Sequence, residues 1–151
     1  MLSSRGRRGA SADQYAGLVE QILLGIGVDP ALARMNVDSG FGWNFKRGSA
    51  LIEIYIAQAD DVAYFQVLSP IMHLPPTNLL PLYRRLLETN LQITNAAFGV
   101  HQDIIYIFSE RRLEGMDAQE ANTIINMVAQ YADEFDDRLI AEFGGRLYNR
   151  I

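Results

Sequence analysis

The chain has 151 residues, 49% of them hydrophobic and 21% charged, a composition that favours one globular domain and excludes a disordered chain. It contains no cysteine, which excludes a disulfide framework, a thiolate nucleophile and a cysteine metal site, and which fits a cytoplasmic protein. The net charge is −5, and ten basic against 18 acidic residues remain when the three N-terminal arginines are set aside; this excess of acid disfavours nucleic acid and anionic lipid as partners.

The first ten residues carry Arg5, Arg7 and Arg8 and predict a disordered basic tail, followed by a single domain over residues 11–151. No stretch approaches the ~18 apolar residues of a membrane-spanning helix. We expect no secretory signal either, because Asp13 and Glu20 interrupt the region that would have to be apolar. The sequence therefore predicts no membrane partner.

The first helix is predicted to begin at Ser11, because Ser11 and Gln14 have the spacing of a capping box. Apolar residues then recur every three or four positions from Tyr15 to Ile26, as on one face of an amphipathic helix, and two glycines end the pattern. The connection that follows contains a proline, and one short helical turn is expected at 31–35.

Three strands joined by two turns are predicted between residues 42 and 70, and the rest of the chain is organised around them. Within them β-branched and aromatic residues alternate with other residues, and a period of two places each set on one face. The first face carries Trp43, Phe45, Ile52, Ile54, Ile56, Ala63, Phe65 and Val67. The short turns predict antiparallel pairing, since parallel neighbours need a long crossover.

The opposite face of these strands is half apolar. It carries Leu51, Tyr55, Tyr64 and Leu68. An antiparallel sheet that faces water on one side usually alternates cleanly between apolar and polar residues. We therefore expect both faces to be covered, the second by a helix, a second subunit or a ligand.

The second helix is predicted to run from a cap at Thr77 or Asn78 to Asn90, after an extended proline-rich connector. Its apolar stripe consists of Leu79, Leu82, Tyr83, Leu86 and Leu87. A second hairpin is predicted over 96–100 and 104–108, and it is again apolar on both faces. The side chains on its second face are Ile104, Tyr106 and Phe108.

The last helix is predicted to begin after a cap at Asp117 and to keep its apolar spacing as far as Gly144. Its surface carries an acidic run, Asp133, Glu134, Asp136 and Asp137. A regular helix presents carboxylates too sparsely for a calcium or magnesium loop. The run therefore predicts a solvated helix face.

No catalytic or metal motif is present. His73 and His101 are the only histidines and lie 28 positions apart, and no cysteine accompanies them. We expect surface or interface histidines, no metal, no organic cofactor and no catalytic residues.

The predicted order is helix, three strands, helix, two strands, helix: an α+β domain with a five-stranded, mainly antiparallel sheet and three main helices. Together with several short segments, this order resembles the YbjN-like bacterial domain family, which has the type III secretion chaperone-like fold. The segments are Trp43-Asn44, 47–50 before 52–54, 67–70, 78–88, 112–117 and 131–137. The resemblance covers about residues 12 to 145 and offers no catalytic residues. It implies a homodimer that binds extended segments of client proteins, by analogy of fold.

Three functional hypotheses remain open. The first is a protein- or peptide-binding module, chaperone-like or regulatory, and the second is a structural dimer without a client. The third is an enzyme with an unrecognised site. For the first, the expected binding residues are Tyr55, Tyr64 and Leu68 on the second sheet face or Leu82 and Leu86 on the second helix, because exposed apolar patches and aromatic side chains mark interaction surfaces.

Overall fold

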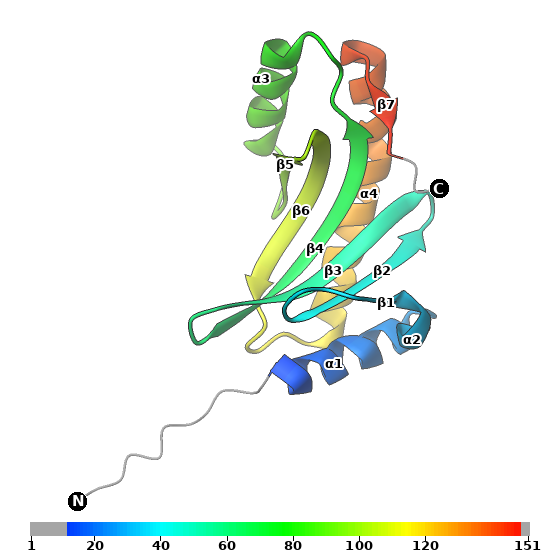
Figure 1. Cartoon of the computed structure of the whole chain (residues 1–151), viewed down its shortest axis with the longest axis vertical. Helices are drawn as coiled ribbons and strands as arrows, with labels where there is room; N and C mark the ends of the chain where they lie inside the picture. The colour runs from blue at the N-terminus through cyan, green and yellow to red at the C-terminus, as the bar shows by residue number, and fades with distance from the viewer. Residues whose placement is uncertain (1–11, 149–151) are drawn as a thin grey trace, which may run out of the picture.

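One antiparallel sheet with its long helices on a single face makes up residues 12–148, the part of the chain that the computed structural model describes (Figure 1). The basic tail and the Ser11 cap predicted above lie outside these residues. The helices are α1 (Ala12–Gly25), α2 (Pro30–Ala33), α3 (Leu79–Asn90) and α4 (Ala118–Phe143). The strands are β1 (Arg34–Met35), β2 (Phe41–Arg47), β3 (Ala50–Ala59), β4 (Val62–His73), β5 (Ala97–His101), β6 (Ile104–Arg112) and β7 (Arg146–Leu147).

The strands are ordered β1-β2-β3-β4-β6-β5, each antiparallel to its neighbour, while β7 pairs with the end of β4. The register confirms the predicted faces. Trp43 pairs with Ile54, and Ile54 pairs with Val67, so these three side chains form one row across β2, β3 and β4. All three are fully buried. The α+β class, the antiparallel sheet and the three main helices agree with the sequence prediction.

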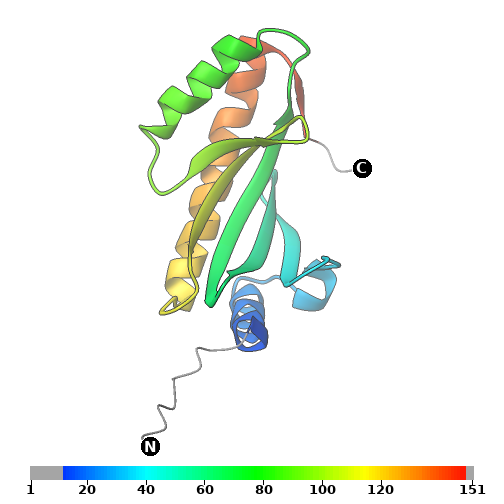
Figure 2. The same cartoon turned by 60° about the vertical axis from the view of Figure 1, so that its left-hand side comes forward.

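Helix α4 covers the face on which this row lies (Figure 2). It contacts β3, β4 and β6 and runs the length of the sheet. Its buried stripe is Ala121, Ile124, Ile125, Val128, Ala129, Ala132 and Leu139. Helix α1 packs against α4 and β3, and α3 packs against β5. The core therefore lies in the single layer between these helices and one face of the sheet.

The predicted caps show how the local sequence fixes the helix ends. The Asp117 carboxylate accepts a hydrogen bond of 2.8 Å from the Glu120 amide at the start of α4. Asn78 precedes α3 but makes no side-chain cap and has a positive φ of 61°. Helix α3 ends at Asn90 as predicted, and the Asn90 amide group bonds both backbone groups of Phe98 on β5, at 2.7 and 3.4 Å.

The sheet differs from the prediction in strand number, because residues 12–148 contribute seven strands and five were predicted. Strands β1 and β7 have two residues each, too few for a period of two to be visible in the sequence. Strand β4 also continues through Pro70 to His73, where an extended connector was predicted. Proline has no amide hydrogen to donate, and the β4–β6 register accordingly shifts between Pro70 and Met72.

Leu82 and Leu86 correct one part of the site prediction. Both were expected on an exposed stripe of the second helix, but their side chains are 0% and 4% exposed. They lie on the face of α3 that packs into the hydrophobic core. The exposed leucines are Leu80 and Leu87 of α3 and Leu91 immediately after it, on the opposite side of the helix.

This burial gives a direct test on α3. We expect Leu82→Ala to lower the free energy of unfolding by about 2–5 kcal/mol, since it leaves a cavity in the core. The matched substitution Leu87→Ala, at a side chain that is 68% exposed, should change it by less than about 0.5 kcal/mol. Urea denaturation followed by circular dichroism measures both values. Equal effects would show that α3 does not pack as described.

Candidate functional site

The face of the sheet opposite α4 is the candidate site. Its rows are defined by register: Asn44, Glu53, Leu68, Phe108 and Ala97 lie side by side across β2, β3, β4, β6 and β5. Every side chain in this row is half-buried or exposed, in contrast to the buried row beneath α4. Within residues 12–148 no helix packs on this face, so a covering helix, one of the three alternatives considered, is absent there.

A shallow apolar depression of about 270 Å³ lies on this open face. Its lining comes from four strands: Glu53, Tyr55, Leu68, Gly99, Val100, His101, Tyr106 and Phe108. We call these eight residues the open-face patch. Gly99 lies opposite Tyr106 on β6 and has no side chain of its own, so the rings of Tyr106 and Phe108 stay accessible beside it. Phe108 is 37% exposed, unusually high for a phenylalanine in a sheet.

One carboxylate, that of Glu53 on β3, lines the open-face patch. The Tyr55 hydroxyl donates a hydrogen bond of 2.8 Å to Glu53 Oε2. Burial raises the pKa of Tyr106 above its ordinary value, and the nearby charge of Glu53 raises it further. The phenol of Tyr106 therefore stays protonated at neutral pH and can donate a hydrogen bond. The patch combines a leucine and three aromatic rings with one anionic group and its hydrogen-bond donors.

The structure brings together some of the residues predicted to bind a partner and separates others. Tyr55 and Leu68 both line the open-face patch. Tyr64 lies on the same face but nearer the other end of β4, opposite Ala57 and Arg112, and does not line the depression. Tyr106 and Phe108 were predicted on this face. The β4–β6 pairing places Tyr106 beside Pro70 and Phe108 beside Leu68.

Sequence reasoning missed the contribution of β5 to the patch. Gly99, Val100 and His101 line the depression because β5 pairs with β6 at the edge of the sheet. The turn between these strands is formed by Gln102 and Asp103, both with positive φ, 48° and 62°. This is the backbone form of a two-residue hairpin turn. A two-residue turn fixes the register of the two strands that it joins. The usual sequence signal for such a turn is a glycine, and this turn has none.

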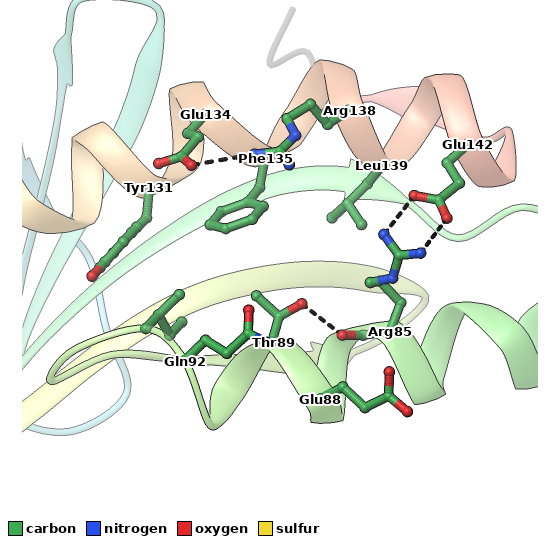
Figure 3. Close-up of a pocket in the computed structure, with 11 residues that line it drawn as sticks. Arg85, Glu88, Thr89, Gln92, Tyr131, Glu134, Phe135, Arg138, Leu139 and Glu142 are labelled. Carbon is green, nitrogen blue, oxygen red and sulfur yellow. Dashed lines mark hydrogen bonds and ion pairs between the residues drawn. The ribbon is translucent and has the colours of Figure 1, made fainter.

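A larger cavity, about 660 Å³, lies elsewhere, between α3 and α4 (Figure 3). Arg85 of α3 reaches across it and forms a two-pronged ion pair with Glu142 of α4, at 2.8 and 2.6 Å. Arg138 pairs with Glu134 within α4. Phe135 and Leu139 of α4 point into the cavity. Because its charged groups already neutralise one another, this groove offers a ligand little electrostatic gain, and we place the candidate site on the open face.

The acidic run of α4 comprises Asp133, Glu134, Asp136 and Asp137. Residues 12–148 contain no group of three or more histidine, aspartate or glutamate side chains that could hold a metal ion. Asp133 Oδ1 accepts a hydrogen bond of 2.5 Å from Ser49 Oγ. Burial, with added repulsion from Asp137 and Asp133, raises the pKa of Asp136, although its hydrogen bond from the Asp137 amide opposes the shift.

The two histidines lie in different surroundings. His73, at the end of β4, stacks on Tyr148 with ring centroids 5.6 Å apart. His101 is exposed at the rim of the open-face patch. Within residues 12–148 no serine or threonine hydroxyl is hydrogen-bonded to a histidine. None of the described helices is both long enough and apolar enough to cross a membrane.

This arrangement of strands and helices is the fold of the type III secretion chaperones and of YbjN. No family model and no curated protein matches the sequence. Among solved structures, the chain is similar to a chain in the crystal structure of the ExsC–ExsE complex, with a TM-score of 0.66 at 9% identity over 87% of this chain and 97% of that one.

A second similar structure contains the Yersinia pestis type III secretion chaperone SycH with a stable fragment of YscM2, with a TM-score of 0.58 at 10% identity over 80% and 98% of the two chains. YbjN from E. coli has a TM-score of 0.53 at 13% identity over 93% and 97%. At such low identities the likeness shows a shared fold, in agreement with the resemblance seen in the sequence.

The electrostatics of the open-face patch can be tested at Glu53. We expect Glu53→Gln to lower the pKa of Tyr106, because the substitution removes a neighbouring negative charge. The value should stay above the ordinary 10.0, since burial is the larger cause of the shift. Titration of the tyrosine ring carbons by NMR measures it. Glu110→Gln, whose carboxylate bonds Gln66 on the same face, is the control, and an equal shift there would contradict the assignment.

The second test concerns Asp136. Its folded-state pKa lies above the ordinary value of 3.8, so the folded chain holds this proton more tightly than the unfolded chain does. The protonated Asp136 side chain therefore contributes stability below about pH 3.8, and this contribution is lost as the pH rises through the folded-state pKa. We expect Asp136→Asn to raise the free energy of unfolding at neutral pH by about 0.3 kcal/mol, a typical value for like charges on an exposed helix. Urea denaturation should show this gain disappear below pH 3.8; a loss of stability at neutral pH would contradict it.

Proposed function

We propose that this chain is a non-enzymatic, protein-binding module, chaperone-like in fold, which binds an extended segment of another protein on the open-face patch. The observation that carries the proposal is the uncovered apolar depression with Tyr55, Leu68, Tyr106 and Phe108. A contiguous apolar surface on a water-soluble domain marks an interaction site. Aromatic side chains are enriched among the residues that dominate binding energy.

The shape of the depression favours a protein partner over a small molecule. Small-molecule sites enclose most of the ligand surface within roughly 300–1,000 Å³. The depression here has about 270 Å³ and lies on the face of a sheet, where it can contact a ligand from one side only. An extended peptide can lie across such a face and use several shallow contacts together.

The edge of the sheet is less available to such a segment than its face. The Asn90 amide group already occupies the outer backbone groups of Phe98 on edge strand β5. On the other edge, β1 has only two residues. Side-chain contacts on the open face are therefore the main source of affinity in the proposed complex, and Glu53 favours a segment that brings a hydrogen-bond donor or a positive charge.

The comparisons support the same proposal. The similar structures include a secretion chaperone and a two-protein complex, each solved with a bound protein or fragment. Their likeness to this chain lies in the fold, so the identity of a partner does not follow from it.

A homodimer is the second part of the proposal, with the outer face of α3 as its contact. Leu80, Leu87 and Leu91 are 80%, 68% and 90% exposed and recur at helical spacing. They lie on the side of α3 opposite Leu82 and Leu86, so a second copy can cover them without disturbing the core. In this arrangement the open-face patch stays free for the client.

The experiment is a selection of random linear peptides on the immobilised protein, followed by affinity measurement with variants. We expect the selected peptides to lose about tenfold or more in affinity on the Leu68→Ser/Phe108→Ser double variant, since these side chains form the centre of the patch. Both are partly exposed, so the melting temperature should change little.

Leu87→Glu is the matched control, because it places a polar side chain at an exposed leucine outside the patch. We expect it to halve the mass measured by light scattering while peptide affinity is retained. Equal peptide affinity for the wild type and the double variant would refute the open-face proposal. Dissociation of the dimer by the double variant would instead mean that the open face is the dimer contact, the structural-dimer alternative.

A further inference from the structure

The sheet opens between β3 and β4. These strands pair from Ala59 and Val62 as far as Glu53 and Leu68, and no pair follows, although both strands continue. Beyond that point β4 pairs with β7 on the same edge, and the Ile71 carbonyl accepts a hydrogen bond of 3.1 Å from the Tyr148 amide. Figure 1 shows β3 and β4 diverging, with α4 behind the gap. A cavity of about 290 Å³ occupies this position, and we call it the notch.

A buried hydroxyl group without a partner lines the notch. Ser69 is 0% exposed, and its Oγ atom makes no hydrogen bond within residues 12–148. Leaving a buried polar group unsatisfied costs about 1–3 kcal/mol, so such a group in a folded protein requires an explanation. Ser109, the other buried serine of the core, does have a partner, the Asn95 carbonyl at 2.7 Å. Ser69 Oγ therefore keeps its hydrogen-bonding capacity for a ligand that enters the notch.

The charge around the notch is negative. Asp136 and Asp137 line it from α4, and Asp133 lies one turn earlier, bonded to Ser49. None of the three carboxylates forms an ion pair with arginine or lysine within residues 12–148. Lys46 is the one cationic residue in the lining. Burial, together with the neighbouring charges of Asp137 and Asp133, raises the pKa of Asp136.

The rest of the lining is mostly apolar. Ser49 and Tyr148 add hydroxyl groups, and the apolar residues are Ala50, Leu51, Pro70, Ile71, Ala132 and Leu147. A ligand that fits must therefore bring a compact positive charge to the carboxylates and an aliphatic part to these walls. A metal ion does not meet this description, because no group of three suitable ligands exists among the described residues. An ammonium group does, since it has three donors and no acceptor.

We propose that the notch binds a primary ammonium group carried on a short aliphatic chain. Its three N–H donors bond Ser69 Oγ and the carboxylates of Asp136 and Asp137, and its methylene groups lie against Leu51 and Ile71. The volume of about 290 Å³ sets the size limit at one such chain.

Two sources supply this chemistry: a free aliphatic amine, or a lysine side chain of the bound protein segment. The second source rests on the proposed function. Leu51 shares the open face with Leu68, and Pro70 pairs with Tyr106 of the open-face patch. A segment lying on that patch can therefore reach the notch with a lysine. The free amine requires only the notch.

The test uses ¹⁵N–¹H NMR titration of the full chain with defined probes. These are cadaverine, Nα-acetyl-lysine methylamide and, as the uncharged isostere, Nα-acetyl-norleucine methylamide; magnesium chloride serves as the metal alone. We expect saturable shifts of the Ser69, Ile71 and Asp136 amide signals with both amines and none with norleucine. Asp136→Asn should weaken binding about tenfold or more, as expected for loss of a hydrogen bond to a charged group, and Ser69→Ala should weaken it less.

Asp38→Asn, at an exposed aspartate outside the notch lining, is the matched control and should leave binding unchanged. Since Asp136→Asn is expected to keep or raise the stability, lost binding cannot be attributed to unfolding. Equal shifts with norleucine, shifts without saturation, tighter binding of magnesium at the same residues, or full affinity in Asp136→Asn would each overturn the proposal.

A further comparison distinguishes the two sources of the ammonium group, a free amine and a lysine side chain. If lysine-containing peptides selected on the open-face patch lose affinity in Asp136→Asn as much as cadaverine does, the lysine source is supported. Amine binding with no peptide selection at all would leave the notch as a free-amine site and refute the proposed function alone.

Discussion

The packing of α4 against one face of the sheet is the interaction on which the rest of the structure depends. One helix of 26 residues presents its buried stripe to three of the central strands. Each large apolar side chain removed from water there contributes roughly 1.5–3 kcal/mol. No other described helix spans the sheet in this way, and α1 and α3 fill the remaining ends of the same layer. The helices of residues 12–148 thus cover one face only.

The open face follows from this one-sided cover. The residues on it alternate with the core residues along the same strands, so Leu68 must point away from α4 if Val67 points toward it. Both faces of the sheet are partly apolar, but the helices cover only one of them. Leucine and aromatic side chains therefore stay accessible on the other face. The fold itself is shared with a chain of the ExsC–ExsE complex and with the secretion chaperone SycH. The proposed binding role rests on these accessible side chains, Tyr55, Leu68, Tyr106 and Phe108.

The gap between β3 and β4 has a similar origin. Strand β3 is anchored to α4 through the turn before it, where Ser49 bonds Asp133 and Arg47 bonds Asn126 at 2.9 Å. Strand β4 is held on its other side by β6 and, at its end, by β7. The two strands therefore separate where their anchors differ, and the space between them brings serine, carboxylates and apolar walls together from four separate segments of the chain.

Local sequence patterns were enough to predict which residues alternate on a strand, where the last helix begins after Asp117, and that Leu68 and Tyr55 share a face. These follow from periodicity and capping, which act between residues close in the chain. The sequence could not determine the side of α3 that is buried, since Leu82 and Leu87 are equally apolar, nor the two-residue strands β1 and β7, which exist only because a longer strand lies beside them. The open-face patch depends on register between β4, β6 and β5, and the notch on divergence of β3 from β4. Both are set by contacts between distant segments, so only the tertiary structure decided them.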